Sequence, residues 1–179
     1  MGEIDFIDES HGFICGYESK NGTDSIFLLK TTDCGMSWTR LNTGFTVTIN
    51  LMEFVSKSTG WIVVNNELLK TTDAGVTWKK QLPLKDVTIT RIFFADDKNG
   101  WIAHSRVPLK EYSYDNYQLQ RTTDGGHSWH IVNYVFSQIE NPGFEPDISD
   151  MYFNKSNQGW ILTLTGKLLK TQNGGNIIN

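Results

Sequence analysis

Apolar and polar residues alternate along this chain in short runs, without the spacing of an amphipathic helix. Four short runs are rich in aromatic and aliphatic residues, and each is followed by a polar turn: 4–6, 51–54, 91–94 and 151–153. Aromatic and β-branched residues bounded by turn residues are typical of strands. No stretch shows the 3.6-residue period of a helix, so the pattern predicts an all-β chain.

Two further motifs follow each run. The first is a glycine, an aromatic residue and isoleucine, and it begins at Gly12, Gly60, Gly100 and Gly159, with Phe13 in place of tryptophan in the first copy. The second has the form Thr-Thr-Asp-x-Gly-x-Ser/Thr-Trp in three copies and decays in the fourth after Thr-Gln-Asn-Gly-Gly. All six tryptophans occupy these two motifs. Such self-similarity identifies a repeat protein.

One repeat thus contains four predicted strands. Strand 1 is the apolar run, strand 2 starts at the Gly-Trp motif, strand 3 ends in the threonines, and strand 4 follows the last tryptophan. Four-stranded antiparallel units repeating about every 40 to 50 residues are typical of β-propeller blades, and a solenoid of stacked sheets is the alternative. We therefore expect one propeller-type domain over 1–179, with repeats of roughly 1–44, 45–84, 85–137 and 148–179 and an incomplete last blade.

The Asp motif is suited to a tight turn between strands 3 and 4. Short side chains with oxygen atoms satisfy backbone N–H groups that leave the ladder, glycine accepts a positive φ, and a tryptophan anchors the turn by burial. We assign these structural roles to fourteen residues: Thr31, Asp33, Gly35, Trp38, Thr71, Asp73, Gly75, Trp78, Thr122, Asp124, Gly126, Trp129, Asn173 and Gly175.

The Asp motif resembles the Asp-box or BNR repeat, Ser/Thr-x-Asp-x-Gly-x-Ser/Thr-Trp/Phe, and three copies match it at each fixed position. The fuller repeat is most similar to the photosystem II assembly-factor-like propellers, and more distantly to the sialidase-type Asp-box propellers. This resemblance covers nearly the whole chain and implies a β-propeller. For function it implies only a scaffold, because unrelated sites are built on propellers.

Composition narrows the classes of partner. The chain carries 16 basic and 20 acidic residues with no basic run, which argues against a nucleic-acid partner. No window approaches the roughly 20 apolar residues of a membrane span, and the first residues do not resemble a signal peptide, so localisation stays open. Two cysteines and four scattered histidines give neither a disulfide scaffold nor a metal site. We expect no cofactor and no metal.

No catalytic constellation is recognisable. A sialidase would need an arginine cluster and a Tyr/Glu nucleophile pair, whereas the chain has four scattered arginines. A glycosidase would need two opposed carboxylates, which sequence alone does not assign when they come from different blades. The aspartates of the Asp motif are poor candidates, because each has a turn to close and recurs once per blade. We expect no catalytic residue.

Insertions point to a binding face. The interval from the Gly-Trp glycine to the motif aspartate is 21 residues from Gly12 and 13 from Gly60, and the third repeat has a still longer one. The connection from the third to the fourth repeat is also expanded. We therefore expect expanded loops between strands 2 and 3 of the first and third repeats. In an up-and-down blade these loops leave at the same end as the connection from strand 4 to the next strand 1. We predict binding through 105–119 and 137–149, using Tyr112, Tyr114, Tyr117, Phe144, Glu145 and Asp147. The alternative is that the tyrosines cover their own loop or continue the strands.

The sequence leaves the two ends of the repeat array unmatched, because the fourth repeat stops before its strand 4. Three arrangements would follow: a fragment of a larger propeller, two chains that complete one another as a homodimer, or an imperfect four-blade ring. The expected function is a non-catalytic binding or assembly scaffold for a protein partner. The alternative is a carbohydrate-binding or glycoside-hydrolase-like propeller, favoured by the loop aromatics.

Overall fold

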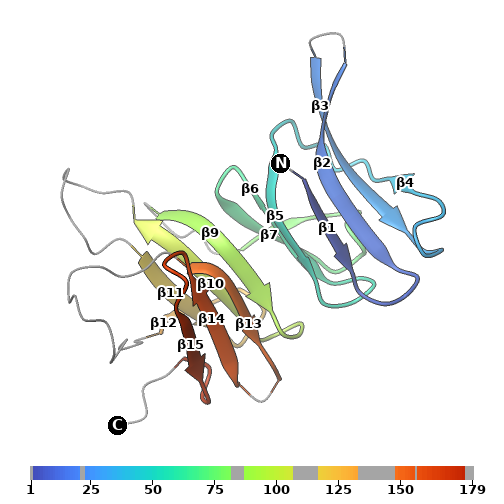
Figure 1. The fold of residues 1–179 in the computed structure, drawn as a ribbon. Helices are drawn as coiled ribbons and strands as arrows, with labels where there is room; N and C mark the ends of the chain where they lie inside the picture. Colours follow the sequence, from blue (N-terminus) through green and yellow to red (C-terminus); the bar gives the residue numbers. More distant parts are fainter. Residues whose placement is uncertain are drawn as a thin grey trace. The chain divides into compact units, whose positions relative to one another are not determined.

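The computed structural model describes residues 2–20, 23–81, 87–106, 117–132, 148–155 and 157–175. Each regular element in these ranges is a β-strand, and the strands form four antiparallel sheets in chain order (Figure 1). The all-β prediction is therefore confirmed. None of the described residues lies in a helix that is long and apolar enough to cross a membrane.

The chain divides into two compact units, Met1–Pro83 and Leu84–Asn179. The first unit holds sheet 1, made of β1 (Glu3–Phe6), β2 (Gly12–Lys20), β3 (Thr23–Thr31) and β4 (Thr39–Arg40). It also holds sheet 2, made of β5 (Ile49–Phe54), β6 (Gly60–Val64), β7 (Glu67–Thr71) and β8 (Lys79–Lys80). In both sheets each strand pairs with the next along the chain, the meander expected of a propeller blade.

The second unit has the same plan. Sheet 3 consists of β9 (Val87–Phe94), β10 (Gly100–Arg106), β11 (Tyr117–Thr122) and β12 (His130–Ile131). Sheet 4 has three strands in the described part of the chain: β13 (Ile148–Phe153), β14 (Gly159–Thr163) and β15 (Leu168–Thr171). Each sheet thus begins with an apolar run and contains one copy of each motif.

Strand register gives every sheet two distinct faces. The last phenylalanine of strand 1 pairs with the glycine of the Gly-Trp motif, as in Phe54↔Gly60. Its side chain and the next aromatic residue, Trp61, therefore point to opposite faces. We call the face with the strand 1 phenylalanine the back face and the face with the motif aromatic the front face.

The core of each unit lies between a front face and the back face of the following sheet. In the first unit, Phe13, Cys15 and Leu28 of sheet 1 pack against sheet 2 residues that include Met52 and Phe54. Burial raises the pKa of the Cys15 thiol to about 11. In the second unit, Trp101, Ala103 and Leu119 of sheet 3 pack against Met151, Phe153 and Ile161 of sheet 4.

Two aromatic rings stack at the centre of each core. Phe13 and Phe54 lie parallel with their centroids 3.6 Å apart, and Trp101 and Phe153 do the same at 3.9 Å. The strand 1 phenylalanine also meets the last tryptophan of its own Asp motif edge to face, with centroids 6.1 Å apart for Phe54 and Trp78. One ring therefore joins its own blade to its own turn and to the preceding blade.

The glycine of the Gly-Trp motif is required by this ring. A Cβ added at Gly60 would lie 2.5 Å from Cδ1 of Phe54, and the same clash arises in the other three sheets between Gly12 and Phe6, Gly100 and Phe94, and Gly159 and Phe153. The phenylalanine ring therefore lies directly over the glycine of the neighbouring strand. A glycine at this position lets the ring sit flat against the sheet.

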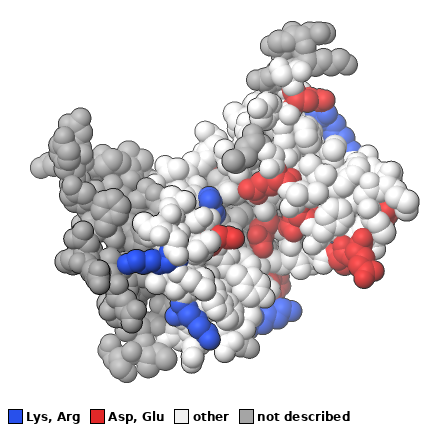
Figure 2. All heavy atoms as spheres, viewed as in Figure 1, with Lys and Arg blue, Asp and Glu red and all other residues white. Residues whose placement is uncertain are grey.

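Polar side chains connect the first strand of one sheet with the first strand of the next sheet in the same unit. The Glu3 and Asp5 carboxylates of β1 accept hydrogen bonds from the backbone N–H groups of Met52 and Phe54 on β5, at 2.7 and 2.6 Å. Acidic side chains gather where β1 and β5 lie (Figure 2). In the second unit Arg91 of β9 donates to the carbonyl oxygen of Ser149 on β13, at 2.6 Å. Side chains thus satisfy the open edge of the following strand.

We predict that Gly60→Ala destabilises the chain by about 1–3 kcal/mol, because the new methyl group displaces a Phe54 ring that is only 5 % exposed. The measurement is the free energy of unfolding by urea titration. In a Phe54→Leu background the same substitution should cost clearly less, since the smaller side chain leaves room. Equal costs in the two backgrounds would show that the ring does not impose the glycine.

Candidate functional site

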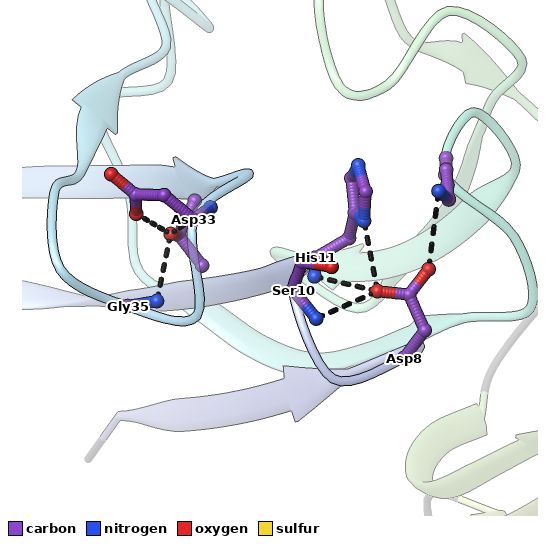
Figure 3. Close-up of polar contacts among 7 residues, drawn as sticks. Asp8, Ser10, His11, Asp33 and Gly35 are labelled. Carbon is purple, nitrogen blue, oxygen red and sulfur yellow. Dashed lines mark hydrogen bonds and ion pairs between the residues drawn. The ribbon is translucent and has the colours of Figure 1, made fainter.

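The Asp turns are the most regular polar feature of the structure, and a threonine hydroxyl is the centre of each. In the first turn Thr31 Oγ1 accepts hydrogen bonds from the backbone N–H groups of Asp33 and Gly35, at 3.3 and 3.0 Å, and donates to Asp33 Oδ1 at 2.7 Å (Figure 3). Thr71 and Thr122 make the same three bonds in the second and third turns. These threonines are buried, so the bonds supply partners to groups that water cannot reach.

The aspartate carboxylate closes the other side of the turn. Oδ1 of Asp33 accepts from the backbone N–H of Ser37 at 2.9 Å, and Oδ2 accepts from the Ser37 hydroxyl. The hydroxyl bond, then the backbone N–H, holds the pKa of Asp33 at about 2. Thr77 acts in the same way on Asp73, whose pKa is also about 2. In the third turn the Ser128 hydroxyl lowers the pKa of Asp124.

Two successive residues of each turn have left-handed backbone conformations. The predicted glycine has a φ of 82° at Gly35 and 85° at Gly75. The residue before it also has a positive φ, which the sequence analysis missed, because Cys34 and Ala74 occupy that position at 64°. The glycine carbonyl then accepts from the indole N–H of the closing tryptophan, at 3.1 Å for Gly35 and Trp38. The hydrogen bonds of the turn outweigh the strain of a left-handed non-glycine residue.

The fourth turn keeps the threonine part of the network. Thr171 Oγ1 donates to Asn173 Oδ1 at 2.8 Å and accepts from the N–H groups of Asn173 and Gly175. An asparagine therefore replaces the aspartate without changing these three bonds. The structural roles assigned to the fourteen motif residues stay a prediction.

The Asp turns share one end of each blade with the turn between strands 1 and 2. Backbone hydrogen bonds join the two turns in all four sheets, for example from Cys34 N–H to the Ser10 carbonyl and from Ala74 N–H to the Ser58 carbonyl. Aspartates close the second kind of turn as well. Asp8 accepts from the N–H groups of Ser10 and His11 and from the His11 ring (Figure 3). These carboxylates all serve turn closure.

The opposite end of the blades is where strand 2 ends and strand 3 begins, and we call it the connection end. The predicted binding segments are 105–119 and 137–149. Tyr112 and Tyr114 lie outside the described residues, as do Phe144, Glu145 and Asp147. Tyr117 is the first residue of β11, where its backbone pairs with Ser105, so this position belongs to a strand and not to a loop. The structure therefore leaves the predicted binding set untested as a group.

The insertion in the first repeat has a different form from the expected loop. β2 and β3 are each nine residues long and remain paired to Lys20↔Thr23, whereas the corresponding strands of the second sheet, β6 and β7, have five residues each. The extra residues therefore lengthen a hairpin. Arg40 braces it by donating to Glu18 at 2.8 Å and to Ser25 at 2.9 Å.

Sequence reasoning missed the strand 1 phenylalanines as key residues. Their signal is a fixed interval of six residues before the motif glycine, as from Phe54 to Gly60. It also missed Arg121, whose guanidinium lies 5.2 Å from the Trp101 ring and donates to Asn157 Oδ1 at 2.6 Å. Burial lowers the pKa of Arg121. Lysines occupy the equivalent position elsewhere, so a cation over the motif aromatic recurs in each blade.

Comparison with solved structures places the fold in a known class. A structure of YCF48 bound to D1 peptide superposes with a TM-score of 0.54 at 18% sequence identity, over 97% of this chain and 64% of that one. YCF48 from Cyanidioschyzon merolae gives 0.58 at 16%, over 96% and 52%. The GH74 enzyme of Niastella koreensis gives 0.59 at 19%, over 92% and 27%.

The chain is a partial β-propeller, as its four meander sheets and these neighbours show. It spans about two thirds or less of the length of these three chains. No protein-family model matches the sequence. No curated protein matches it either. The neighbours thus include both YCF48 and a GH74 enzyme, and at these identities they define the fold alone.

We predict that Asp73→Asn makes the chain less sensitive to acid. The pKa of Asp73 is about 2 in the folded chain, whereas an aspartate without the contacts of the turn has a pKa of 3.8. The turn therefore contributes its full stability above pH 3.8 and loses it as the pH falls toward 2. The measurement is the urea midpoint of both proteins from about pH 7 to about pH 2.5.

The expected result is a gap between the two midpoints that is widest at neutral pH and narrows through this window. The variant should remain folded at neutral pH, because Asn173 already makes the equivalent threonine bond. A gap of constant size at all pH values would contradict the assigned role of the charge.

Proposed function

We propose that this chain is a non-catalytic binding or assembly scaffold built from Asp-box propeller blades, similar in kind to the photosystem II assembly-factor propellers. It recognises a protein partner through the connection end, using the segments 105–119 and 137–149. The contrast between the two ends of the blades carries this proposal.

The Asp-turn end supports a structural role. Its aspartate carboxylates accept hydrogen bonds from hydroxyl and backbone N–H groups of their own turn. The same set of bonds recurs from blade to blade. A low carboxylate pKa suits a fixed acceptor. It does not suit a general acid, which must hold a proton near neutral pH. The geometry of this end repeats in each blade, and it therefore favours a scaffold role over a catalytic one.

The connection end supports recognition, because it varies while the Asp-turn end repeats. The β2–β3 hairpin is extended by four residues per strand relative to β6–β7, and β10 with seven residues exceeds β6 with five. Segments of variable length on a rigid sheet framework are where binding usually resides. The aromatic residues of the predicted segments suit a protein surface.

The structural neighbours add to this reasoning in one respect. One of them is a YCF48 propeller bound to D1 peptide, so a propeller of similar fold takes a polypeptide ligand. The GH74 neighbour is an enzyme, and it keeps a carbohydrate ligand as the alternative. Binding to a glycan array, or hydrolysis of a polysaccharide, would favour that alternative over a protein partner.

The test uses a partner isolated by affinity capture on the wild-type chain and then purified. We predict that replacing Tyr112, Tyr114 and Tyr117 together by alanine weakens its binding by at least about tenfold, which is about 1.4 kcal/mol. The measurement is the dissociation constant by titration calorimetry. Circular dichroism checks that the variant folds.

The matched control changes the other end of the blades. Met36→Ala with Val76→Ala removes two exposed side chains of the Asp turns, 83 % and 61 % exposed, and should leave the dissociation constant unchanged. Unchanged binding by the tyrosine variant, or loss of binding by the control, would refute recognition through the connection end.

A further inference from the structure

A short fourth strand covers the outer edge of strand 3 in sheets 1, 2 and 3. The residue after this fourth strand donates its backbone N–H to a leucine carbonyl of strand 3, at 2.8 to 2.9 Å: Leu41 to Leu28, Gln81 to Leu68 and Val132 to Leu119. Among the described residues, the pairing of strands 3 and 4 goes no further toward the connection end. These bonds therefore mark where the cover of strand 3 stops.

Strand 3 runs much further past this point in sheet 1 than in the other two sheets. β7 begins at Glu67, directly before its last covered residue, and β11 begins at Tyr117. β3 begins at Thr23, so residues 23–27 extend beyond Leu28, and in the described part of the chain they pair only with β2. Figure 1 shows the β2–β3 hairpin projecting beyond β4. Residues 23–27 thus have one open side, which we call the hairpin edge.

Alternate residues of β3 point their backbone groups to the hairpin edge. In an antiparallel sheet the N–H and C=O of one residue point to the same side, and those of the next residue point to the other side. Leu28 accepts the Leu41 N–H on the outer side. Ile26 and Asp24 therefore also present their N–H and C=O groups there.

One side chain occupies part of the hairpin edge. Arg40 donates to the Ile26 carbonyl at 2.8 Å, and its guanidinium also bonds Glu18 and Ser25. The Arg40 and Glu18 side chains are 48 % and 53 % exposed, so this part of the hairpin faces solvent. The Ile26 N–H and both backbone groups of Asp24 have no protein partner in the described part of the chain.

We propose that the hairpin edge binds an extended segment of the protein partner, which adds as a strand beside residues 24–26. The inference rests on the proposed function, because it names backbone groups of the connection end that a polypeptide uses. Open N–H and C=O groups at strand spacing match the backbone of an extended chain, and such edges gain affinity through main-chain hydrogen bonds. A partner residue opposite Asp24 makes two such bonds, and the Ile26 N–H gives a third.

Arg40 favours a foreign strand over a second copy of this chain. An antiparallel ladder over residues 24–26 of two copies would need the Ile26 carbonyl of each, and Arg40 already holds that carbonyl. It would also bring two guanidinium groups to one ladder. A foreign strand that ends beside Arg40 avoids both costs, so Arg40 sets the point where the partner strand stops.

The experiment selects linear peptides from a phage-displayed library on the purified chain, after depletion of the library on Asp24→Pro. Proline removes an N–H at the hairpin edge and keeps the ladder to β2, because that N–H points away from β2. The surviving peptides are then synthesised and titrated against the full chain. Asp24→Pro should weaken their binding by at least about fivefold.

The matched control lies on the other side of the same hairpin. Ser19 pairs directly with Asp24, and its N–H points to the opposite edge. Ser19→Pro should bind the selected peptides as tightly as the wild type does. Loss of binding by this control as well would mean that an intact hairpin, and not its outer edge, is what the peptides require.

Hydrogen exchange on the wild-type chain gives a readout that needs no variant. With a selected peptide bound, the amide protons of Asp24 and Ile26 should exchange at least about tenfold more slowly than in the free chain, as measured by NMR. The Ser19 amide should keep its rate. Unchanged exchange at both Asp24 and Ile26 would place the peptide elsewhere on the molecule.

Two further results would overturn the inference. If no peptide survives the depletion, the hairpin edge takes no extended chain. If the wild type has twice the chain mass of 20.4 kDa and Asp24→Pro does not, the occupant is a second copy. The proposed function fails separately, when the captured partner binds the chain with Tyr112, Tyr114 and Tyr117 replaced as tightly as the wild type.

Discussion

The strand 1 phenylalanine is the residue on which the packing of these blades depends. Its ring lies over a glycine of strand 2, meets the closing tryptophan of the Asp turn edge to face, and stacks on an aromatic residue of the preceding sheet. Three elements of the repeat thus converge on one side chain. A large apolar ring buried among aromatic neighbours contributes both area and preferred geometry. The glycine, the turn tryptophan and the motif aromatic are explained by that ring.

The two ends of the blades have different roles. At one end, threonine and aspartate side chains close each turn and leave the carboxylates with fixed partners. This end is set by hydrogen bonds to the backbone, and the fourth turn keeps the threonine network with an asparagine in place of the aspartate. The other end is free to vary in length, which is where a scaffold of this kind acquires a partner. Function and folding are therefore separated along each blade.

Much of the fold could be predicted because the residue types within each repeat indicate where its strands and its turn lie. The apolar run 151–153 ends β13, the Gly-Trp motif begins β14, and the fourth Asp motif begins at Thr171, where β15 ends. The glycine's role in packing could not be predicted from one strand, since it depends on the register that places Phe153 opposite Gly159. The longer first hairpin was mistaken for a loop because strand extension and loop insertion add the same residues.

Less of the candidate site could be predicted from the sequence. The turn network follows from short-range side chains such as Thr71 and Asp73, whose partners lie within a few residues. A binding surface instead depends on how segments from different blades meet, which no local pattern encodes. Arg121 illustrates the same limit, because its partners Trp101 and Asn157 come from strands and turns far apart in the chain.

A double-mutant cycle on Trp101 and Phe153 tests the central role of the stacked ring most directly. The unfolding free energies of the wild type, Trp101→Leu, Phe153→Leu and the double variant give the coupling between the two side chains. Stacking across the blade interface predicts a favourable coupling of about 0.5–1.5 kcal/mol. Additive losses, with no coupling, would mean that the rings fill space independently and that the phenylalanine does not join the blades.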